Sequence, residues 1–287
     1  MTNFVMAPAW VAYRVSRRFF YTLRGKNQLV AGHAPSWGEE WKAVSGLLHA
    51  KSKTPVESKP GRWETAVGQV EAPAGSQSWY ISVMSHEISS NVYSLGPEDR
   101  VVMDCGANIG LFTLQALRNG AERVIAFEPS PETAACLRSN VKNDPRVTVL
   151  EKGAWDREEI LRFSTSVGEN PGSHHISDTG TLTIAATTID SVVEQLGLTR
   201  LDFIKMDIEG AETRALQGAT QTIRRFHPRI CVATEHTEDL YRNNLDVIEV
   251  MRRIDPAYRY TCTESHPYTS PSAGHVMTPF TLLFSRK

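Results

Sequence analysis

Between residue 100 and the C-terminus, short apolar runs alternate with segments in which apolar residues recur every three or four positions. Strands buried in a parallel sheet are nearly continuous apolar runs, whereas the helices that cover such a sheet carry one apolar face. The runs predict strands at 100–105, 122–128, 146–151, 201–207, 229–236, 258–264 and 280–286. The periodic segments predict helices at 111–119, 130–143, 191–197, 211–226 and from Thr237 to Ile254. This alternation indicates an α/β fold with a parallel sheet that has helices on both faces.

Two further pairs of segments alternate between apolar and polar residues, which is the pattern of half-buried strands. Residues 62–72 and 78–85 predict a hairpin that leads into the main domain. Residues 159–166 and 181–188 predict a hairpin inserted between two strands of the main sheet.

The first 30 residues carry five Arg and Lys residues and no acid, interleaved with aromatic residues. Their apolar residues do not form one clean stripe, so we expect a helix that packs on the main domain; peripheral contact with an anionic membrane surface is the alternative. The segment lacks the apolar core and cleavage site of a signal peptide. Residues 33–62 are rich in Pro, Gly, Ser and Lys, as in a linker. We therefore expect an N-terminal extension over 1–75 and a main domain over 76–287.

The overall composition restricts the partners and the compartment. The formal net charge is −1, which gives no sign of a nucleic-acid partner. None of the four cysteines forms a CxxC pair, so we expect a reduced, cytoplasmic protein. No apolar run has the length that a membrane-spanning helix needs.

The strongest local signal is "DCGANIG", residues 104–110, at the end of the first main strand. Gly106 and Gly110 open the next helix and expose bare backbone near its N-terminus, where a ligand can bind. The segment differs from the GxGxxG pattern of dinucleotide sites and begins with an acid, Asp104. A carboxylate repels a pyrophosphate and attracts a cation, so the turn favours a positively charged ligand.

The second main strand ends in Glu128 and Pro129. A carboxylate at this place can accept hydrogen bonds from both hydroxyls of a ribose. Together with the glycine turn, Glu128 therefore implies a ligand with a ribose and a positive group, namely S-adenosylmethionine.

The segment "VVMDCGANIGLFTLQALRNGAERVIAFEPSPET" and the later "LDFIKMDIEGAE" resemble the FkbM family of S-adenosylmethionine-dependent methyltransferases. The shared motifs are D-x-G-A-N-x-G, F-E-P and K-x-D-x-E-G-A-E, and the resemblance covers roughly residues 80–260. It implies a Rossmann-like class I methyltransferase fold, with a seven-stranded, mostly parallel sheet whose last strand is antiparallel. It also implies O-methylation of hydroxyls on sugars, polyketides and similar metabolites.

The resemblance implies roles for residues at three strand ends. The glycine turn would hold the methionine end of the cofactor, Glu128 the ribose, and the small residues after the third strand the adenine. The cofactor-binding set expected on this basis is Asp104, Gly106, Ala107, Asn108, Gly110, Glu128, Pro129, Gly153, Ala154 and Asp207.

Methyl transfer to a hydroxyl needs an aligned acceptor and a group that takes its proton. Our first choice of base is His236, since an imidazole titrates near neutral pH, with Asp207 or Glu235 orienting it. A capping or surface role for His236 is the alternative. Glu209 is a further catalytic candidate, although its alternative role is favourable charge in the first turn of a helix. Magnesium could join these groups, but the spacing does not imply a metal.

The loop of the inserted hairpin carries Asn170, Ser173 and His174, which could fold over the acceptor. We therefore expect a small-molecule or saccharide acceptor. One alternative is a nucleic-acid methyltransferase, against which the main domain lacks a basic stripe and the N/D-P-P-Y/F motif. Another is a cofactor-binding module without catalysis. The sequence indicates no oligomeric state.

Overall fold

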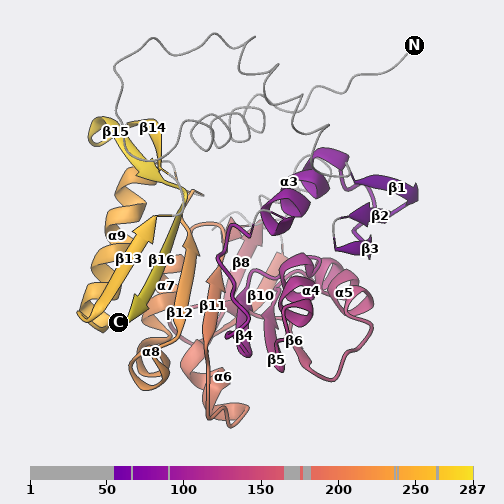
Figure 1. Ribbon diagram of the computed structural model, residues 1–287, viewed down its shortest axis with the longest axis horizontal. Coiled ribbons are helices and arrows are strands. Elements are labelled where there is room, and N and C mark those ends of the chain that lie inside the picture. Colours follow the sequence, from indigo (N-terminus) through magenta and orange to yellow (C-terminus); the bar gives the residue numbers. More distant parts are fainter. Residues whose placement is uncertain are drawn as a thin grey trace.

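The computed structural model describes residues 55–65, 67–89, 91–164, 175–176, 182–235, 237, 239–262 and 265–286. Its centre is a seven-stranded sheet in the order β13-β16-β12-β11-β4-β5-β6 (Figure 1). The strands are β4 (Val101–Cys105), β5 (Arg123–Phe127), β6 (Val147–Leu150), β11 (Phe203–Met206), β12 (Arg229–Ala233), β13 (Tyr258–Cys262) and β16 (Thr281–Arg286). Within it, β16 runs antiparallel to both of its neighbours, and the other pairs are parallel. The mostly parallel sheet with an antiparallel last strand is thus confirmed.

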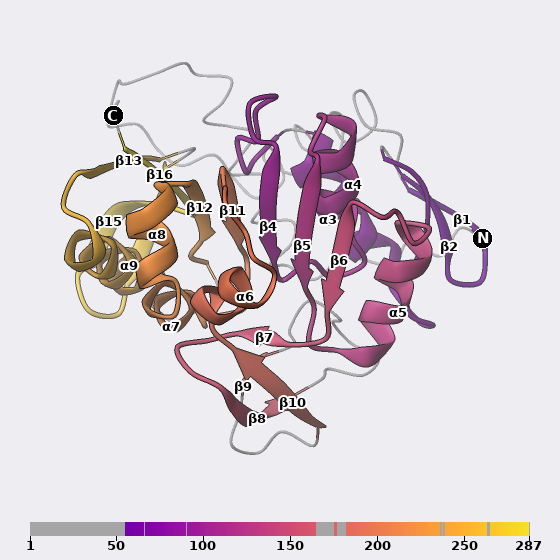
Figure 2. The same cartoon turned by 90° about the horizontal axis from the view of Figure 1, so that it is seen from below.

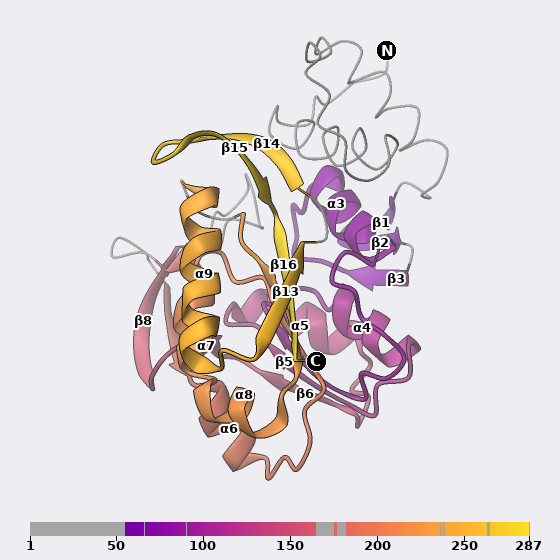
Figure 3. The ribbon, with the colours of Figure 1, turned by 60° about the vertical axis from the view of Figure 1, so that its left-hand side comes forward.

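Helices cover both faces of this sheet, as Figure 3 shows. One face is covered by α6 (Ile189–Gln195), α7 (Glu212–Gln217), α8 (Thr220–Phe226) and α9 (Leu240–Ile254). The other face is covered by α3 (Ser78–Ser89), α4 (Leu111–Arg118) and α5 (Pro131–Asn140). The α/β architecture predicted from the sequence is therefore correct.

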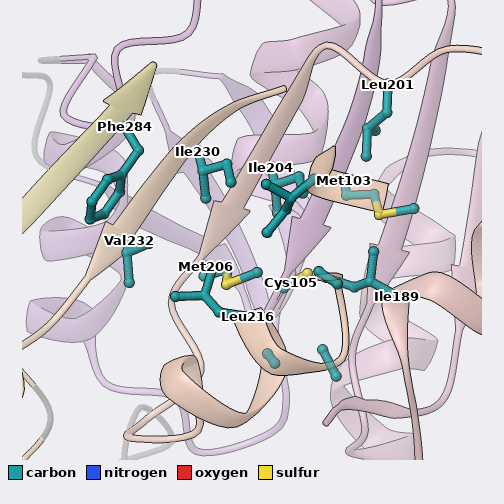
Figure 4. Close-up of a cluster of buried hydrophobic side chains, with 14 of the residues drawn as sticks. Met103, Cys105, Ile189, Leu201, Ile204, Met206, Leu216, Ile230, Val232 and Phe284 are labelled. Carbon is teal, nitrogen blue, oxygen red and sulfur yellow. The ribbon is translucent and has the colours of Figure 1, made fainter. Parts of the chain in front are cut away.

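The main core lies between the sheet and the helices α6 to α9 (Figure 4). Alternate strand residues such as Met103 and Cys105 point into it, together with Ile204 and Met206 of β11. Side chains alternate between the faces of a strand, so Asp104 and Lys205 must point to the opposite face, toward α3 and α4. This alternation explains how a carboxylate and an ammonium come to lie side by side within a buried sheet.

Two of the smaller sheets in the described part of the chain lie outside the main sheet, one before β4 and one after β6. An antiparallel sheet of β1 (Val56–Lys59), β2 (Arg62–Thr65) and β3 (Gly68–Glu71) packs Trp63 and Val70 into the same core as α3 and α4. The inserted sheet, in the order β7-β10-β8-β9, follows β6 in the chain (Figure 2). Its strands are β7 (Gly153–Ala154), β8 (Glu159–Ser164), β9 (His175–Ile176) and β10 (Leu182–Thr187). The predicted inserted hairpin is confirmed as the antiparallel pair of β8 and β10.

The prediction of a strand over residues 78–85 is wrong, because this segment forms most of helix α3. Local alternation of polar and apolar residues suggested a strand. The buried residues Ile81, Ser85 and Ile88 follow one another by four and three positions, which is the spacing of one helix face. The error matters because it concealed Tyr80 of this helix, whose hydroxyl contacts Asn108.

The structure differs from the predicted elements at two other places. The helix predicted over 211–226 is divided into α7 and α8 at Gly218, where a Cβ would overlap the main-chain carbonyl of Trp155. The hairpin of β14 (Ser265–Ser270) and β15 (Gly274–Pro279) was not predicted; it packs against α9.

The basic segment 1–30 and most of the predicted linker lie outside the described residues. Within the described ranges, no helix combines the length and the apolar character needed to cross a membrane.

Candidate functional site

The turn between β4 and α4 is held tightly by its neighbours in the fold. The main-chain N–H groups of Gly106 and Ala107 both donate to the carbonyl of Phe127 at the end of β5, at 3.1 and 2.8 Å. Gly106 has φ +78° and Gly110 φ +89°, values that favour glycine. A Cβ at Gly106 would overlap the carbonyl oxygen of Asp207. The close approach that requires Gly106 is therefore made by the end of β11, and a ligand contact of the turn stays a prediction.

Beneath the turn, Asp104 forms a buried ion pair with Lys205. The register of β4 and β11 pairs these two residues directly, and Lys205 Nζ lies 3.3 Å from Asp104 Oδ1. Thr113 Oγ1 donates to Asp104 Oδ2 at 2.7 Å, and Lys205 Nζ donates to the carbonyl of Gly106 at 2.7 Å. Asp104 is 0% exposed, and its ion pair with Lys205 holds the ammonium that donates to Gly106, so Asp104 stabilises the turn through Lys205. A direct contact between Asp104 and a bound ligand stays a prediction.

Lys205 keeps its charge although it is buried. Burial acts to lower the pKa of its ammonium, but Asp104 and Asp207 outweigh burial, so the pKa lies above its usual value. The ammonium also lies 5.3 Å from the ring centroid of Tyr93, within the range of a cation–π contact.

Glu128 connects the turn to the beginning of α5. Its Oε2 accepts a hydrogen bond from the main-chain N–H of Asn108 and its Oε1 from that of Ser130, each at 2.9 Å. The residue is only 5% exposed. Burial raises its pKa to about 7, although the two N–H groups act in the opposite direction. Glu128 therefore changes its charge within the physiological pH range.

The segment after β11 brings further carboxylates to the same edge of the sheet. Asp207 and Glu209 are partly buried, and Glu209 has φ +56°. Asp207 Oδ2 accepts a hydrogen bond from the Tyr93 hydroxyl at 2.7 Å. Glu212 is fully buried, and its Oε1 accepts hydrogen bonds from the main-chain N–H groups of Ile208 and Gly210 at 3.1 and 3.2 Å. Glu212 thus holds the loop that carries Asp207 and Glu209.

Two tyrosines at this edge were not among the residues predicted from the sequence. Tyr80 comes from α3, and its hydroxyl oxygen accepts a hydrogen bond from Asn108 Nδ2. Burial raises the pKa of Tyr80, the Asn108 contact lowers it, and the charges of Glu209, Glu128 and Asp207 raise it further. These three carboxylates are therefore close enough to the Tyr80 hydroxyl for their charges to act on it. A sequence signal that competes with the local alternation is the spacing of Ile81 and Ile88, which also fits one face of a helix; packing against α4 decides between the two patterns.

Comparison with known proteins identifies the family. The methyltransferase FkbM domain matches residues 104–262, which is more than half of the chain. The chain belongs to the FkbM methyltransferase family. The match begins at Asp104, so α3 with Tyr80, and Tyr93 in the turn after it, precede the matched domain.

Curated relatives and a solved structure are similar to parts of this chain. The hexuronic acid methyltransferase AglP of Haloferax volcanii is 31% identical over 128 residues, which are 44% of this chain and 53% of AglP. The 2-O-methyltransferase NoeI of Sinorhizobium fredii is 24% identical over 173 residues, covering 53% of this chain and 70% of NoeI. The FkbM methyltransferase structure from Methylobacillus flagellatus KT is 23% identical with a TM-score of 0.47, covering 68% of this chain and 45% of that one. This chain therefore spans about half the length of AglP, 53%.

The other residues predicted for this FkbM-type site are placed as follows. Pro129 is partly buried beside Glu128. Gly153 and Ala154 pair with β10, and Ala154 belongs to the main core, so their contact with an adenine stays a prediction. Glu235 is partly buried, two residues after the end of β12. His236, Asn170, Ser173 and His174 lie outside the described residues. Among the residues that are described, no group of three or more His, Cys, Asp and Glu side chains could hold a metal ion.

Proposed function

We propose that this protein transfers a methyl group from S-adenosylmethionine to a hydroxyl of a sugar or another small molecule. The observation that carries the proposal is that Glu128 accepts from the N–H of Asn108 in the glycine turn, while Asp207 lies against the same turn at Gly106 and Glu209 follows Asp207 by two residues. Membership of the FkbM family supports methyl transfer. The printed names of AglP and NoeI, a hexuronic acid methyltransferase and a 2-O-methyltransferase, support a hydroxyl acceptor of this chemical class.

The residues present fit the proposed cofactor. Glu128 accepts one hydrogen bond on each oxygen, and each carboxylate oxygen has a second lone pair that can accept from a ribose hydroxyl. The carboxylates of Asp207 and Glu209 attract a sulfonium and an ammonium and repel a pyrophosphate. These carboxylates would therefore repel an anionic nucleotide.

Transfer to a hydroxyl requires a fixed acceptor and a place for its proton. When it is bound, S-adenosylmethionine supplies a methyl group on a sulfonium, which an oxygen can attack because the sulfur leaves as a neutral thioether. We propose that Asp207, Glu209, Glu235 and His236 provide the groups that align the acceptor and take its proton. Alignment alone can contribute about 7–11 kcal/mol, and a positioned base adds roughly 10²–10⁴-fold. The proposal includes no magnesium.

We also propose a cytoplasmic location, which the buried thiol of Cys105, which forms no disulfide, supports.

The direct test is to incubate the protein with methyl-labelled S-adenosylmethionine and a panel of uronic acids and hydroxylated sugars. Labelled methyl ether should form with at least one acceptor. The Glu128→Ala variant should lose cofactor binding in calorimetry, whereas Glu122→Ala, which removes an exposed carboxylate from the preceding loop, should keep it. Absence of cofactor binding by the unmodified protein would refute the proposal. Binding without transfer to the panel or to a cell extract would favour a non-catalytic module.

A further inference from the structure

Helix α3 and the turn after it reach the site from outside the matched family domain. The helix packs against α4 and β2 (Figure 1). Tyr80 in the helix is 8% exposed, and Tyr93 in the following turn is 4% exposed. Both hydroxyls point to residues of the family motifs, one to Asn108 and the other to Asp207.

The Tyr80 contact acts on the conformation of the glycine turn. Asn108 has φ +51°, in the left-handed region that costs energy for a residue other than glycine. Its main-chain N–H donates to Glu128, its Oδ1 accepts from the N–H of Ile109 at 2.8 Å, and its Nδ2 donates to Tyr80. Tyr80 is thus the contact that ties the Asn108 side chain to α3.

The Tyr93 contact acts on the carboxylate of Asp207. The ring of Tyr93 packs edge-on against Phe112, with 5.4 Å between centroids and an interplanar angle of 81°. Its hydroxyl lies 2.7 Å from Asp207 Oδ2 and 3.3 Å from Glu87 Oε2. Because the ring is held by Phe112 and Lys205, its hydroxyl offers Asp207 a fixed hydrogen-bond donor.

These two contacts meet at one place. The carbonyl of Asp207 occupies the space that a side chain on Gly106 would need, so Asp207 lies directly against the glycine turn. A change in the orientation of either Asn108 or Asp207 therefore changes the same binding surface.

We propose that Tyr80 and Tyr93 are positioning residues of this methyltransferase: Tyr80 fixes the cofactor-binding turn through Asn108, and Tyr93 fixes the carboxylate of Asp207 beside the sulfonium. This inference rests on the proposed function. It makes α3 a part of the site, although α3 precedes the matched domain.

The test compares Tyr80→Phe and Tyr93→Phe with Tyr258→Phe. Each change removes one buried phenol hydroxyl and keeps the ring. Tyr258 is the matched control because it is 8% exposed and donates to the carbonyl of Pro228 at 2.8 Å, next to the start of β12 and therefore at the opposite edge of the sheet. Calorimetry with S-adenosylmethionine and with S-adenosylhomocysteine, which lacks the sulfonium charge but keeps the ammonium, separates the two roles, and thermal unfolding measures any general loss of stability.

We expect Tyr80→Phe to raise both dissociation constants at least fivefold and by similar factors, because the turn binds both ligands. We expect Tyr93→Phe to raise the constant for S-adenosylmethionine at least fivefold and that for S-adenosylhomocysteine less than twofold, because Asp207 acts on the charge of the sulfonium. Tyr258→Phe should change neither constant by more than twofold.

A double variant distinguishes positioning of Asp207 from a general effect. Asp207→Asn should remove the preference for the charged ligand, and Tyr93→Phe in that background should change it no further. If the two effects are additive, or if both tyrosine variants bind like Tyr258→Phe, the inference is wrong. If the unmodified protein binds neither ligand, the proposed function itself fails, and the inference fails with it.

Discussion

The buried carboxyl of Glu128 predicts that cofactor affinity depends on pH near neutrality. The pKa of this group is raised to about 7 in the free protein. Ribose hydroxyls that donate to the carboxylate favour its ionised form, so binding lowers this pKa and releases a proton. The affinity for S-adenosylhomocysteine should therefore fall as the pH is lowered through 7.

The size of the effect follows from the ionised fraction. A group with a pKa of about 7 is about 90% ionised at pH 8 and about 10% ionised at pH 6. If only the ionised form binds, the dissociation constant should rise about tenfold between pH 8 and pH 6, and binding at pH 7 should release about half a proton. Both values are upper limits if the protonated form also binds.

The assay is calorimetric titration with S-adenosylhomocysteine at pH 6, 7 and 8, at constant ionic strength. Repeating the titration at pH 7 in buffers of different ionisation enthalpy gives the number of protons released. Glu128→Gln should bind more weakly, because the NH₂ group of the new amide must face the N–H of either Asn108 or Ser130. The variant should also lose the pH dependence, because the amide does not titrate. A dissociation constant that is equal at all three pH values, with no proton released, would show that Glu128 does not meet the ribose.

The same shift has a consequence for stability in the free protein. The pKa of Glu128 is about 7 in the folded state against a reference value of 4.5, so the folded protein binds the proton more tightly than the unfolded chain does. This contribution is fully present below pH 4.5 and is lost as the pH rises through 7, by about 3 kcal/mol in total. In urea unfolding of the free protein, Glu128→Gln should weaken the dependence of stability on pH in this window.

Three further substitutions test the contacts around the turn. Lys205→Met leaves Asp104 as a buried charge without its ion-pair partner and should lower the unfolding free energy by about 3–5 kcal/mol; adding Asp104→Asn should recover part of this loss, and no recovery would contradict the ion-pair argument. Gly106→Ala places a methyl group on the carbonyl of Asp207 and should lower the unfolding free energy by at least about 2 kcal/mol in thermal unfolding. The same variant should lose cofactor binding in calorimetry. Glu212→Ala leaves two main-chain N–H groups without their acceptor and should cost about 2 kcal/mol or more in urea unfolding, whereas Glu212→Gln keeps an acceptor oxygen and should cost less.

The sheet was predictable because its strands are buried on both faces. Continuous apolar runs marked β4, β5, β11 and β12, and the helical spacing between them fixed the order of elements. Helix α3 was not predictable from local alternation, because its polar residues are also placed by tertiary contacts: Ser85 and Glu87 are buried along with the apolar residues of the helix. Only packing against α4 decides between the strand and the helix.

The positions of the glycine turn and of Glu128 at two strand ends were predictable because single motifs carry them, while their contact with a ligand stays a prediction. The site was not predictable where residues meet across strands or from distant segments. Lys205 looked like one residue of an apolar strand, and only the register of β4 and β11 places it beside Asp104. Tyr93 and Asp207 are 114 positions apart in the chain and meet through a hydrogen bond. Spacing within a motif gives no information on such pairs.

Asp104 and Glu128, the two acids that the sequence analysis assigned to the cofactor, occupy different environments. Asp104 is buried and forms an ion pair with Lys205, whose ammonium also donates to the turn, so its charge interacts with a group of the protein itself. Glu128 is held by two main-chain N–H groups, and burial raises its pKa to about 7, so its charge is costly until a donor from outside stabilises it. A ligand with two hydroxyls removes that cost, whereas a ligand without them does not. Discrimination at this edge of the sheet should therefore depend on Glu128, and Asp104 should determine whether the turn exists at all.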